Sequence, residues 1–382
     1  DGGISECATE QEVALAFAAA RSYGRRVTIE RLVEGSRYVG EAGATLASDG
    51  LAALCARASA KLGLEQGAIE LACSEDGEAS VIAVKASAPP REMAPAIEVD
   101  GFLDAFGEDG DGRIPVIAVT GTNGKTTTTL MIAHAAALAG RRTGHTTTHG
   151  VSIGGQIVAK GDCTGYWSHR AVLSAPEVDI AVLETARGGI LKRGLAYDAC
   201  TVGVVLNVSD DHLGMEGVGT VDQLARVKEL VAACATGAAV LNADDQHCVA
   251  MARRIGRGAE LIYFSLDPVN TAMREHIRAG GRALYLDGAG LVIASGADRR
   301  ILMAAADIPS TLGGRARYNI ANSLAAAAAL LGAGFEDADI VAGLSSFVSD
   351  AQSNPLRTNL FEVRGITVVV DYAHNPAAYA SL

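Results

Sequence analysis

The sequence predicts an α/β fold built on a doubly wound parallel sheet. From Ile114 onward, short apolar runs alternate with helical segments along the chain of 382 residues. Runs rich in valine, isoleucine and leucine occupy residues 114–121, 179–184, 200–207 and 237–245. Near-continuous apolar strands separated by helices are typical of a parallel sheet that is covered on both faces. A glycine-rich turn between the first strand and a helix at 125–139 is typical of nucleotide-binding domains of this class.

The composition is that of a globular protein with a net negative charge, since 49% of the residues are hydrophobic and 20% are charged. The 44 acidic residues outnumber the 32 lysines and arginines, and the formal charge of −12 argues against a nucleic-acid partner. The longest apolar run, Ser323 to Phe335, is shorter than the roughly 20 residues that a membrane-spanning helix needs. We expect a cytoplasmic homo-oligomer with no membrane partner.

The cysteines give no sign of a disulfide framework. All seven are scattered singly with no C-x-x-C pair, which also argues against a zinc site. Single, scattered cysteines are typical of proteins in a reducing cytosol.

Three segments follow one another along the chain. Residues 1–112 mix predicted helices at 13–21 and 51–62 with predicted strands at 26–33 and 80–85. The acidic, glycine-rich stretch 107–112 predicts a domain boundary, followed by a central domain at 113–350. Residues 351–382 contain Pro355, a strand at 366–370 and a helix start, which predicts an incomplete, Rossmann-like third domain. Because the chain begins at Asp1 and stops soon after that strand, we expect a fragment of a longer protein.

The strongest local signal is the phosphate-loop motif Gly121-Thr122-Asn123-Gly124-Lys125-Thr126-Thr127. It lies between a buried strand and a helix, where backbone N–H groups and the helix dipole favour a polyphosphate. Lys125 would offer positive charge to the β- and γ-phosphates of a nucleotide, and the Thr126 hydroxyl would ligate Mg²⁺. Val119 replaces the first glycine of the eight-residue pattern, so this is the shorter G-x-x-G-K-T variant. The alternative is a glycine turn followed by a surface lysine.

Two further candidates follow strands of the same sheet. Glu184 ends the strand at 179–184 and His212 follows the strand at 200–207, so both project from the carboxyl edge, where α/β proteins bind ligands. Together with Thr126 they predict a site for one or two divalent ions. Taken alone, Glu184 fits a capping or salt-bridging residue equally well, and His212 fits a solvated loop.

Other polar candidates are a lysine and three asparagines. Lys228 lies on a helix predicted at 221–234, where a lysine usually faces solvent. Asn242 opens the NADD motif that closes another strand. Asn319 and Asn322 share one face of a helix and could hydrogen-bond a base, although Asn319 also fits a helix cap.

In combination, these residues resemble the Mur ligase superfamily over about residues 112–382. The resemblance rests on GTNGKT at 121–126, Glu184, NVSDDH at 207–212, Lys228, NADD at 242–245, Asn319, Asn322, Arg357 and DYAHNP at 371–376. Three more stretches resemble the Mur-type half of the cyanophycin synthetase family: ETARGGILKRGL at 184–195, THG at 148–150 and GDCTG at 161–165.

The resemblance implies an ATP- and Mg²⁺-dependent carbon–nitrogen ligase that works through an acyl-phosphate. It implies catalytic roles for Lys125, Lys228 and His212, with Lys228 carbamylated, and a metal shell of Thr126, Glu184 and His212. Besides the phosphate loop, the residues that it assigns to ATP binding are Asn242, Asn319, Asn322, Arg357 and Asp371.

The resemblance also covers residues 1–112, which look like the tail of an ATP-grasp module with VTIERLVEG at 27–35 as its hinge strand. The metal-binding stretch E-V-N-A of that module aligns with residues 83–86, where Ala83 and Lys85 replace the acid and the amide. Loss of two oxygen ligands and gain of a cation would repel Mg²⁺. We therefore hypothesise that this remnant is catalytically inactive; a misaligned segment is the alternative.

The implied substrates are arginine and an aspartate-polymer (cyanophycin) primer, with arginine joined to aspartate side-chain carboxyls. Two other functions stay open: another Mur-type ligase, such as a poly-glutamate-forming enzyme, or a non-catalytic relic that binds nucleotide or polymer. Trp167, the only tryptophan, follows the GDCTG motif and is interpreted either as a packed core residue or as part of a polymer contact.

Overall fold

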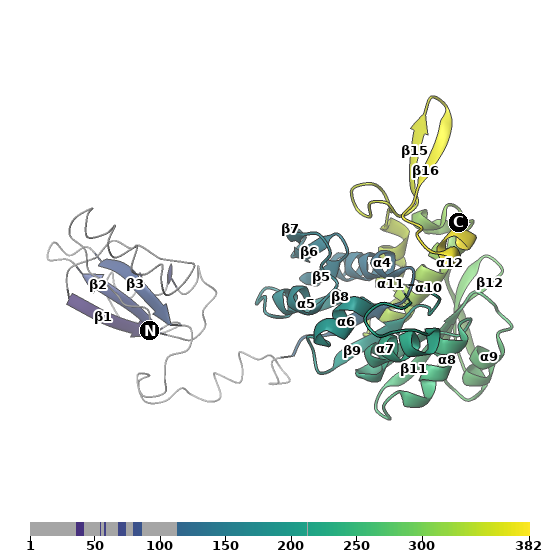
Figure 1. The fold of residues 1–382 in the computed structure, drawn as a ribbon, viewed down its shortest axis with the longest axis horizontal. Helices are drawn as coiled ribbons and strands as arrows, with labels where there is room; N and C mark the ends of the chain where they lie inside the picture. Colours follow the sequence, from purple (N-terminus) through teal and green to yellow (C-terminus); the bar gives the residue numbers. More distant parts are fainter. Residues whose placement is uncertain are drawn as a thin grey trace. The chain divides into compact units, whose positions relative to one another are not determined.

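The computed structural model describes residues 113–211 and 213–382 and, before them, residues 36–41, 54, 57–58, 68–73 and 79–85. The chain separates into two compact units, a first unit at 1–113 and a second unit at 114–382 (Figure 1).

The described part of the first unit contains a three-stranded antiparallel sheet. Its strands are β1 (Ser36–Glu41), β2 (Ala68–Cys73) and β3 (Ala79–Lys85). Ile69 and Leu71 are both buried, as expected for positions two apart on one face of a sheet. The strand predicted at 80–85 is confirmed as β3, whereas the segments predicted at 13–21 and 26–33 lie outside the described residues.

The second unit is built on an eleven-stranded sheet in the order β14-β13-β12-β11-β10-β9-β4-β8-β5-β6-β7. The consecutive strands from β12 to β5 are parallel: β4 (Val116–Thr120), β5 (Thr143–Thr147), β8 (Ile180–Glu184), β9 (Cys200–Val205), β10 (Ala235–Asn242), β11 (Glu260–Ser265) and β12 (Arg282–Asp287). Antiparallel strands extend the two edges: β6 (Gly150–Ile153) and β7 (Gln156–Lys160), and β13 (Gly290–Ser295) and β14 (Asp298–Ala304). The predicted parallel sheet is confirmed, with antiparallel edges that the sequence did not indicate.

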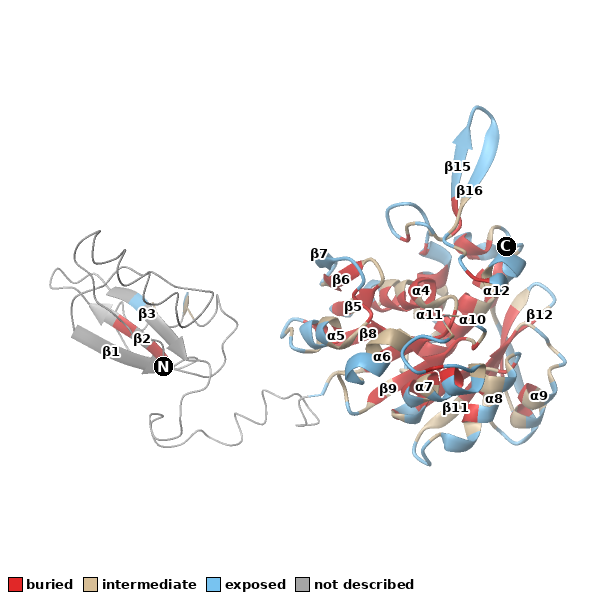
Figure 2. Cartoon of the chain, in the orientation of Figure 1, coloured by how far each residue is buried: buried red, intermediate tan, exposed pale blue. Residues whose placement is uncertain are grey.

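Helices cover both faces of this sheet (Figures 1 and 2). One face carries α4 (Lys125–Leu138), α10 (Arg317–Gly332) and α11 (Asp337–Ser346). The other carries α5 (Tyr166–Leu173), α6 (Arg187–Arg193), α7 (Val221–Ala233), α8 (Gln246–Met251) and α9 (Thr271–Arg278). Short 3₁₀ turns occupy Ala252–Arg254, Ala305–Asp307 and Pro309–Thr311.

Two separate cores explain the continuous apolar strands. Ile117 and Val119 of β4 belong to the core under α4 and α10, whereas Val116 and Ala118 belong to the core on the opposite face. Every position of β4 is buried, because successive side chains point to opposite faces and both faces are covered.

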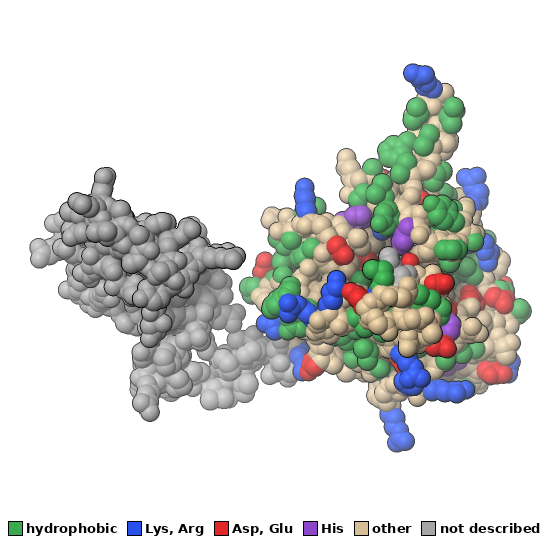
Figure 3. Space-filling view, viewed as in Figure 1, with side chains coloured by type: hydrophobic (Ala, Val, Ile, Leu, Met, Phe, Trp, Pro, Cys, Tyr) green, Lys and Arg blue, Asp and Glu red, His purple; other side chains and the backbone are tan. Residues whose placement is uncertain are grey.

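The C-terminal part consists of a hairpin, β15 (Asn359–Val363) and β16 (Ile366–Val370), followed by α12 (Pro376–Ser381). The strand predicted at 366–370 is confirmed as β16. Leu360, Phe361 and Ile366 are exposed, and Figure 3 shows apolar side chains along the hairpin. Among the helices that the structure describes, none is both long and apolar enough to cross a membrane.

Candidate functional site

The phosphate-loop motif forms the turn between β4 and α4. Gly124, the residue before α4, has a φ of 88°, in the left-handed region that favours glycine. A Cβ atom at Gly124 would also lie 2.3 Å from Asn322 Oδ1 on α10, so a side chain does not fit there. The first N–H groups of an α-helix have no intrahelical acceptor. This turn therefore presents a helix N-terminus suited to a phosphate.

Asn207, which follows β9, holds the loop in place. Its side-chain oxygen accepts hydrogen bonds from the N–H groups of Thr122 (3.1 Å) and Asn123 (2.8 Å). Its amide nitrogen donates to the Asn123 carbonyl at 3.1 Å. Because β9 is the neighbour of β4 in the sheet, this clamp joins the carboxyl ends of adjacent strands. Asn207 is the first residue of the NVSDDH motif, but the sequence alone predicts no role for it.

Two lysine side chains donate to the loop backbone. Lys125 Nζ donates to the Thr122 carbonyl at 2.9 Å, and Lys228 Nζ from α7 donates to the Gly121 carbonyl at 2.8 Å. Lys228 is only 3% exposed, in contrast to the solvent-facing position that is usual for a helical lysine. Burial, and then the positive charge of Lys125, lower the pKa of Lys228 to about 7. A substantial fraction of this amine is therefore neutral near neutral pH.

The Glu184 carboxylate is buried at the end of β8, with 1% of the residue exposed. One carboxylate oxygen accepts from the Thr148 N–H and the other from the Thr148 hydroxyl, both at 3.1 Å. The Thr148 hydroxyl lies 3.5 Å from the Thr126 hydroxyl at the start of α4. Thr148 therefore links Glu184 to the phosphate loop. It is the first residue of the THG motif, but no role was predicted for it.

Neither alternative role of Glu184 is supported. Within residues 113–211 and 213–382, no lysine, arginine or histidine forms an ion pair with Glu184. The N-cap of the following helix, α6, is Ala186. A buried carboxylate without a cationic partner is costly unless another cation balances its charge.

The oxygen donors of Thr126 and Glu184 fit Mg²⁺. This ion prefers oxygen ligands, keeps several waters and is usually held by one or two carboxylates together with substrate phosphates. In the part of the chain that the structure describes, no cluster of three His, Cys, Asp or Glu side chains could hold a metal by itself. His212, the third predicted ligand, lies outside the described residues.

The three asparagines predicted to border a base form hydrogen bonds within the protein. Asn242, the last residue of β10, donates to the Leu206 carbonyl at 2.8 Å. Asn319 accepts from Asn322 at 3.1 Å, and it donates to a backbone carbonyl at 2.7 Å. The N-cap of α10 is Ala316, so the alternative role of Asn319 as a helix cap is wrong.

Residues of the C-terminal segment contact the same loop. Asn375 and Asn123 exchange two side-chain hydrogen bonds, at 2.9 and 3.1 Å. Asn354 donates to the Thr127 hydroxyl at 3.1 Å. No role was predicted for Asn354 or Asn375, and the only available signal was that Asn375 lies in the DYAHNP motif.

The two predicted nucleotide ligands of this segment lie beside these contacts. Asp371 accepts from the N–H and the hydroxyl of Thr358, at 2.8 and 3.1 Å. The Arg357 guanidinium lies 5.0 Å from the centroid of the Tyr372 ring. Burial, and then the charge of Arg357, lower the pKa of His149, the residue after Thr148.

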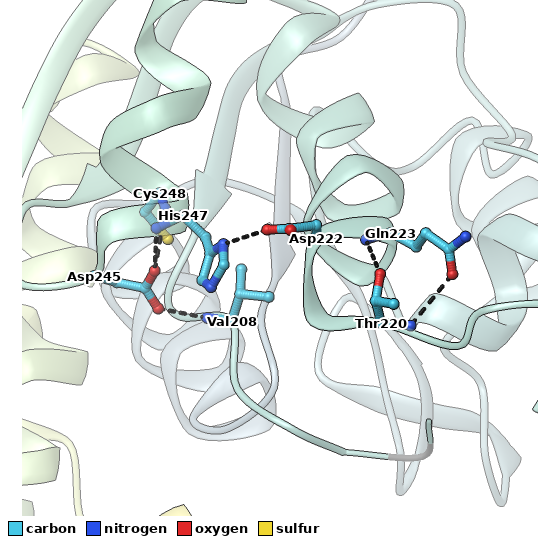
Figure 4. A network of polar contacts seen from close by, with 7 residues as sticks. All are labelled: Val208, Thr220, Asp222, Gln223, Asp245, His247 and Cys248. Atoms are coloured by element: carbon cyan, nitrogen blue, oxygen red, sulfur yellow. Dashed lines mark hydrogen bonds and ion pairs between the residues drawn. The ribbon is translucent and has the colours of Figure 1, made fainter. Parts of the chain in front are cut away.

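A second polar network joins α8 to the segment after β9 and to the first turn of α7 (Figure 4). Asp245 caps α8 and also accepts from the Val208 N–H at 2.6 Å, which ties the segment after β9 to α8. His247 of α8 lies 3.4 Å from the Asp222 carboxylate of α7. The NADD motif thus contributes an asparagine at a strand end and an aspartate that organises the neighbouring helices.

Residues 119–330 match the Mur ligase middle domain. The chain belongs to the Mur ligase family. The matched segment contains the phosphate loop, Glu184 and Lys228, whereas Arg357 and Asp371 lie beyond it.

Cyanophycin synthetases are among the relatives of this Mur ligase chain. The cyanophycin synthetase of Crocosphaera subtropica is 44% identical over 279 residues, which are 72% of this chain and 32% of that protein. The one from Trichormus variabilis is 44% identical over 296 residues, 77% of this chain and 32% of that protein. A UDP-N-acetylmuramoylalanine–D-glutamate ligase of Agrobacterium fabrum is 30% identical over 66% of this chain and 48% of that protein. The chain spans about a third of the length of the cyanophycin synthetases it matches.

Solved structures agree with the family assignment. A UDP-N-acetylmuramoyl-L-alanyl-D-glutamate–2,6-diaminopimelate ligase aligns with a TM-score of 0.51 and 25% identity, covering 69% of this chain and 52% of that chain. MurF from Acinetobacter baumannii aligns with a TM-score of 0.50 and 20% identity, covering 74% and 56%, and shows the fold alone. The predicted resemblance to Mur ligases and cyanophycin synthetases is confirmed.

Trp167 lies on the surface of this Mur ligase chain, next to α6. It is 65% exposed, so the interpretation as a packed core residue is wrong. The Arg193 guanidinium lies 5.3 Å from the centroid of the Trp167 ring. A Cβ atom at Gly189 of α6 would lie 2.8 Å from the Thr164 carbonyl oxygen, so α6 packs directly on the segment before Trp167. Trp167 of α5 and Arg193 of α6 thus form an exposed aromatic and basic contact.

Proposed function

We propose that this chain is the ATP-dependent ligase portion of an enzyme of the cyanophycin synthetase type. It would join arginine to the side-chain carboxyls of an aspartate polymer. The observation that carries this proposal is the buried Glu184 carboxylate, linked through Thr148 to Thr126 of the phosphate loop. The 44% identity to cyanophycin synthetases supports the choice of substrates.

The proposed reaction has two steps. An aspartate side-chain carboxylate attacks the γ-phosphate of ATP, ADP leaves, and an acyl-phosphate forms. The amine of arginine then attacks the acyl carbon, phosphate leaves, and the nitrogen loses a proton to give an amide. Chemistry of this kind depends mainly on positioning and on neutralisation of charge.

The phosphate loop would supply most of that neutralisation. Lys125 would leave the Thr122 carbonyl and turn to the β- and γ-phosphates, beside the N-terminus of α4. A bound Mg²⁺, held by Thr126, Glu184 and His212, would add positive charge at the transferred phosphate.

Lys228 is proposed to be carbamylated. A neutral amine adds to CO₂ and loses a proton, which leaves a carbamate anion on the side chain. The lowered pKa of Lys228 supports this modification, because it leaves a substantial fraction of the amine neutral near pH 7. The carbamate would provide a further carboxylate beside the loop.

The remaining predicted residues would bind the nucleotide. We propose that Asn242, Asn319 and Asn322 border the adenine, and the contact of Asn322 with Gly124 supports a position close to the loop. Arg357 and Asp371 would reach the nucleotide when the C-terminal segment closes over it. The existing contacts of Asn354 and Asn375 with the loop support such closure.

The surface around Trp167 is the proposed contact for the acidic acceptor. Arg193 is exposed on α6 and carries charge opposite to that of aspartate carboxylates, and Lys192 beside it lies 3.5 Å from the Glu216 carboxylate. An aromatic ring beside them adds an apolar surface for the polymer backbone.

Residues 1–112 are proposed to be an ATP-grasp remnant without activity. The backbone of Ala83 and Lys85 lies on β3, where metal-binding oxygens would be required. ADP release that depends on aspartate alone, in a Lys125→Ala background, would contradict this proposal.

The main test is Lys125→Ala in the purified chain. We expect ADP release driven by arginine and an aspartate polymer to fall about 100-fold or more, because a charge at the transferred phosphate is lost. Lys160→Ala, on the exposed strand β7, should keep wild-type turnover. Normal turnover by Lys125→Ala would refute the assignment.

Two further measurements test the alternative functions. ADP release driven by another amino acid in place of arginine would indicate a different Mur-type ligase. Nucleotide binding without turnover of any substrate would favour a non-catalytic relic.

A further inference from the structure

Two cysteines that are far apart in the sequence meet at the base of α7. Cys200 begins β9 and Cys234 follows the last residue of α7, and their sulfur atoms lie 3.7 Å apart. The Cys200 N–H donates to the Cys234 carbonyl at 3.0 Å, so the two backbones are direct neighbours. Cys200 is buried, whereas Cys234 is partly exposed.

Tight packing of α7 on β9 holds the two sulfur atoms beside the same carbonyl oxygen. Both thiols lie within hydrogen-bonding distance of the Val231 carbonyl oxygen, at 3.6 Å for Cys200 and 3.4 Å for Cys234. A Cβ atom at Gly203 would lie 2.2 Å from the same oxygen, so the last turn of α7 presses directly on β9. A disulfide needs a sulfur–sulfur distance of about 2.05 Å. The two Sγ atoms, 3.7 Å apart, must therefore rotate toward each other for the bond to form.

The two thiols differ in pKa and in exposure. The hydrogen bond from Cys200 lowers the pKa of the Cys234 thiol, and the same bond together with burial raises the pKa of Cys200. Since the thiolate is the attacking species, the accessible Cys234 is the nucleophile and the buried Cys200 is the second thiol.

We propose that Cys200 and Cys234 form a reversible thiol–disulfide site that responds to small-molecule disulfides such as oxidised glutathione. The Cys234 thiolate attacks one sulfur of oxidised glutathione, the glutathione disulfide breaks, and one glutathione thiolate leaves. Cys200 then loses its proton and attacks Cys234 Sγ, which forms the protein disulfide and releases the second glutathione. The protein is oxidised by two electrons and the glutathione disulfide is reduced.

The disulfide would fasten the end of α7 to the start of β9. These elements hold Lys228 and lead to Asn207, respectively, and both residues contact the phosphate loop. Oxidation to the disulfide should also raise the melting temperature of the chain, because the cross-link restricts the unfolded chain. The two thiols take no part in the proposed ligase reaction.

The test is oxidation of the reduced, folded chain in glutathione buffers of increasing oxidised fraction. Free thiols are then alkylated, and peptides are mapped by mass spectrometry without reduction. We expect a linked peptide pair containing Cys200 and Cys234, which disappears after reduction, and a higher melting temperature for the oxidised form. Cys200→Ser should accumulate the mixed disulfide of Cys234 with glutathione, and Cys234→Ser should leave Cys200 unmodified.

Matched controls are Cys163→Ala and Cys248→Ala, which alter two other buried cysteines and should leave the linked pair unchanged. A linked pair that forms only after denaturation would overturn the proposal. The proposal would also be overturned if Cys234 of the wild-type chain remained in the mixed disulfide with glutathione. The same holds if the melting temperature did not rise when the Cys200–Cys234 disulfide formed.

Discussion

The phosphate loop and the C-terminal segment contribute to one site in different ways. The loop is local: Gly124 adopts the left-handed backbone that ends the turn and starts α4. The segment is distant in sequence, yet Asn354 and Asn375 donate to residues of the loop and of the first turn of α4. Backbone geometry thus determines where an anion can bind, whereas amides from other elements determine how firmly the loop is held.

The largest effect that tests this difference is expected for Gly124→Ala. The substitution forces an L residue into a φ of 88° and places a Cβ atom 2.3 Å from Asn322 Oδ1. ATP affinity, measured by titration calorimetry, should fall at least about 100-fold because the loop and α10 must separate.

Gly140→Ala is the matched control. Gly140 has a φ of 85°, but an added Cβ would meet nothing within 4 Å. We expect a cost of about 1 kcal/mol in the free energy of unfolding and unchanged ATP affinity. Equal losses of affinity in both variants would mean that general destabilisation, and not the fit of the loop against α10, lowers the affinity.

The next effect concerns Glu184→Gln, which removes a charge but keeps an oxygen acceptor for Thr148. The affinity for ATP in the presence of Mg²⁺ should fall about 10- to 100-fold, while binding of ATP without the metal should not weaken. ATP titrations with and without Mg²⁺ measure both quantities. Glu177→Gln, at an exposed position, is the control. If the ATP affinity fell equally with and without Mg²⁺, Glu184 would only support the fold.

Lys228 predicts a pH dependence of stability. Its folded-state pKa of about 7 lies below the ordinary 10.5, so between these values the unfolded chain binds more protons than the folded one. The free energy of unfolding should therefore rise with pH over this interval, by up to about 1.4 kcal/mol per pH unit, and the penalty should be constant below it. Lys228→Met should lack this contribution in denaturant unfolding at several pH values, whereas Lys160→Met should keep it. Identical slopes for wild type and Lys228→Met would contradict the buried, neutral amine.

The smallest effect is expected for Asn375→Ala. It removes the paired hydrogen bonds with Asn123 and the cap of α12, and should reduce the free energy of unfolding by about 1 kcal/mol and ATP affinity a few-fold. Asn207→Ala should cost more in ATP affinity, because Asn207 holds two N–H groups of the loop itself. If Asn375→Ala weakened ATP binding more than Asn207→Ala, the C-terminal segment would be the main support of the loop.

Several features of the site were predictable because they depend on neighbours in the sequence. A buried strand followed by a glycine turn and a helix predicts a phosphate loop, and the end of an apolar run places Glu184 at the carboxyl edge. The asparagines were harder to interpret. Asn319 and Asn322 bond to each other and to the protein, and only the packing of α10 against Gly124 shows where they lie.

The sequence by itself determined the α/β class, the doubly wound sheet and the phosphate loop, since hydrophobic period and turn chemistry act over a few residues. The tertiary structure alone decided which distant groups meet: Thr148 with Glu184, Asn207 with the loop, and Cys200 with Cys234, which are scattered singly along the chain. It also decided that Trp167 is exposed and that Lys228 is buried. Such pairings follow from the order of strands and the packing of helices on them, which no local pattern encodes.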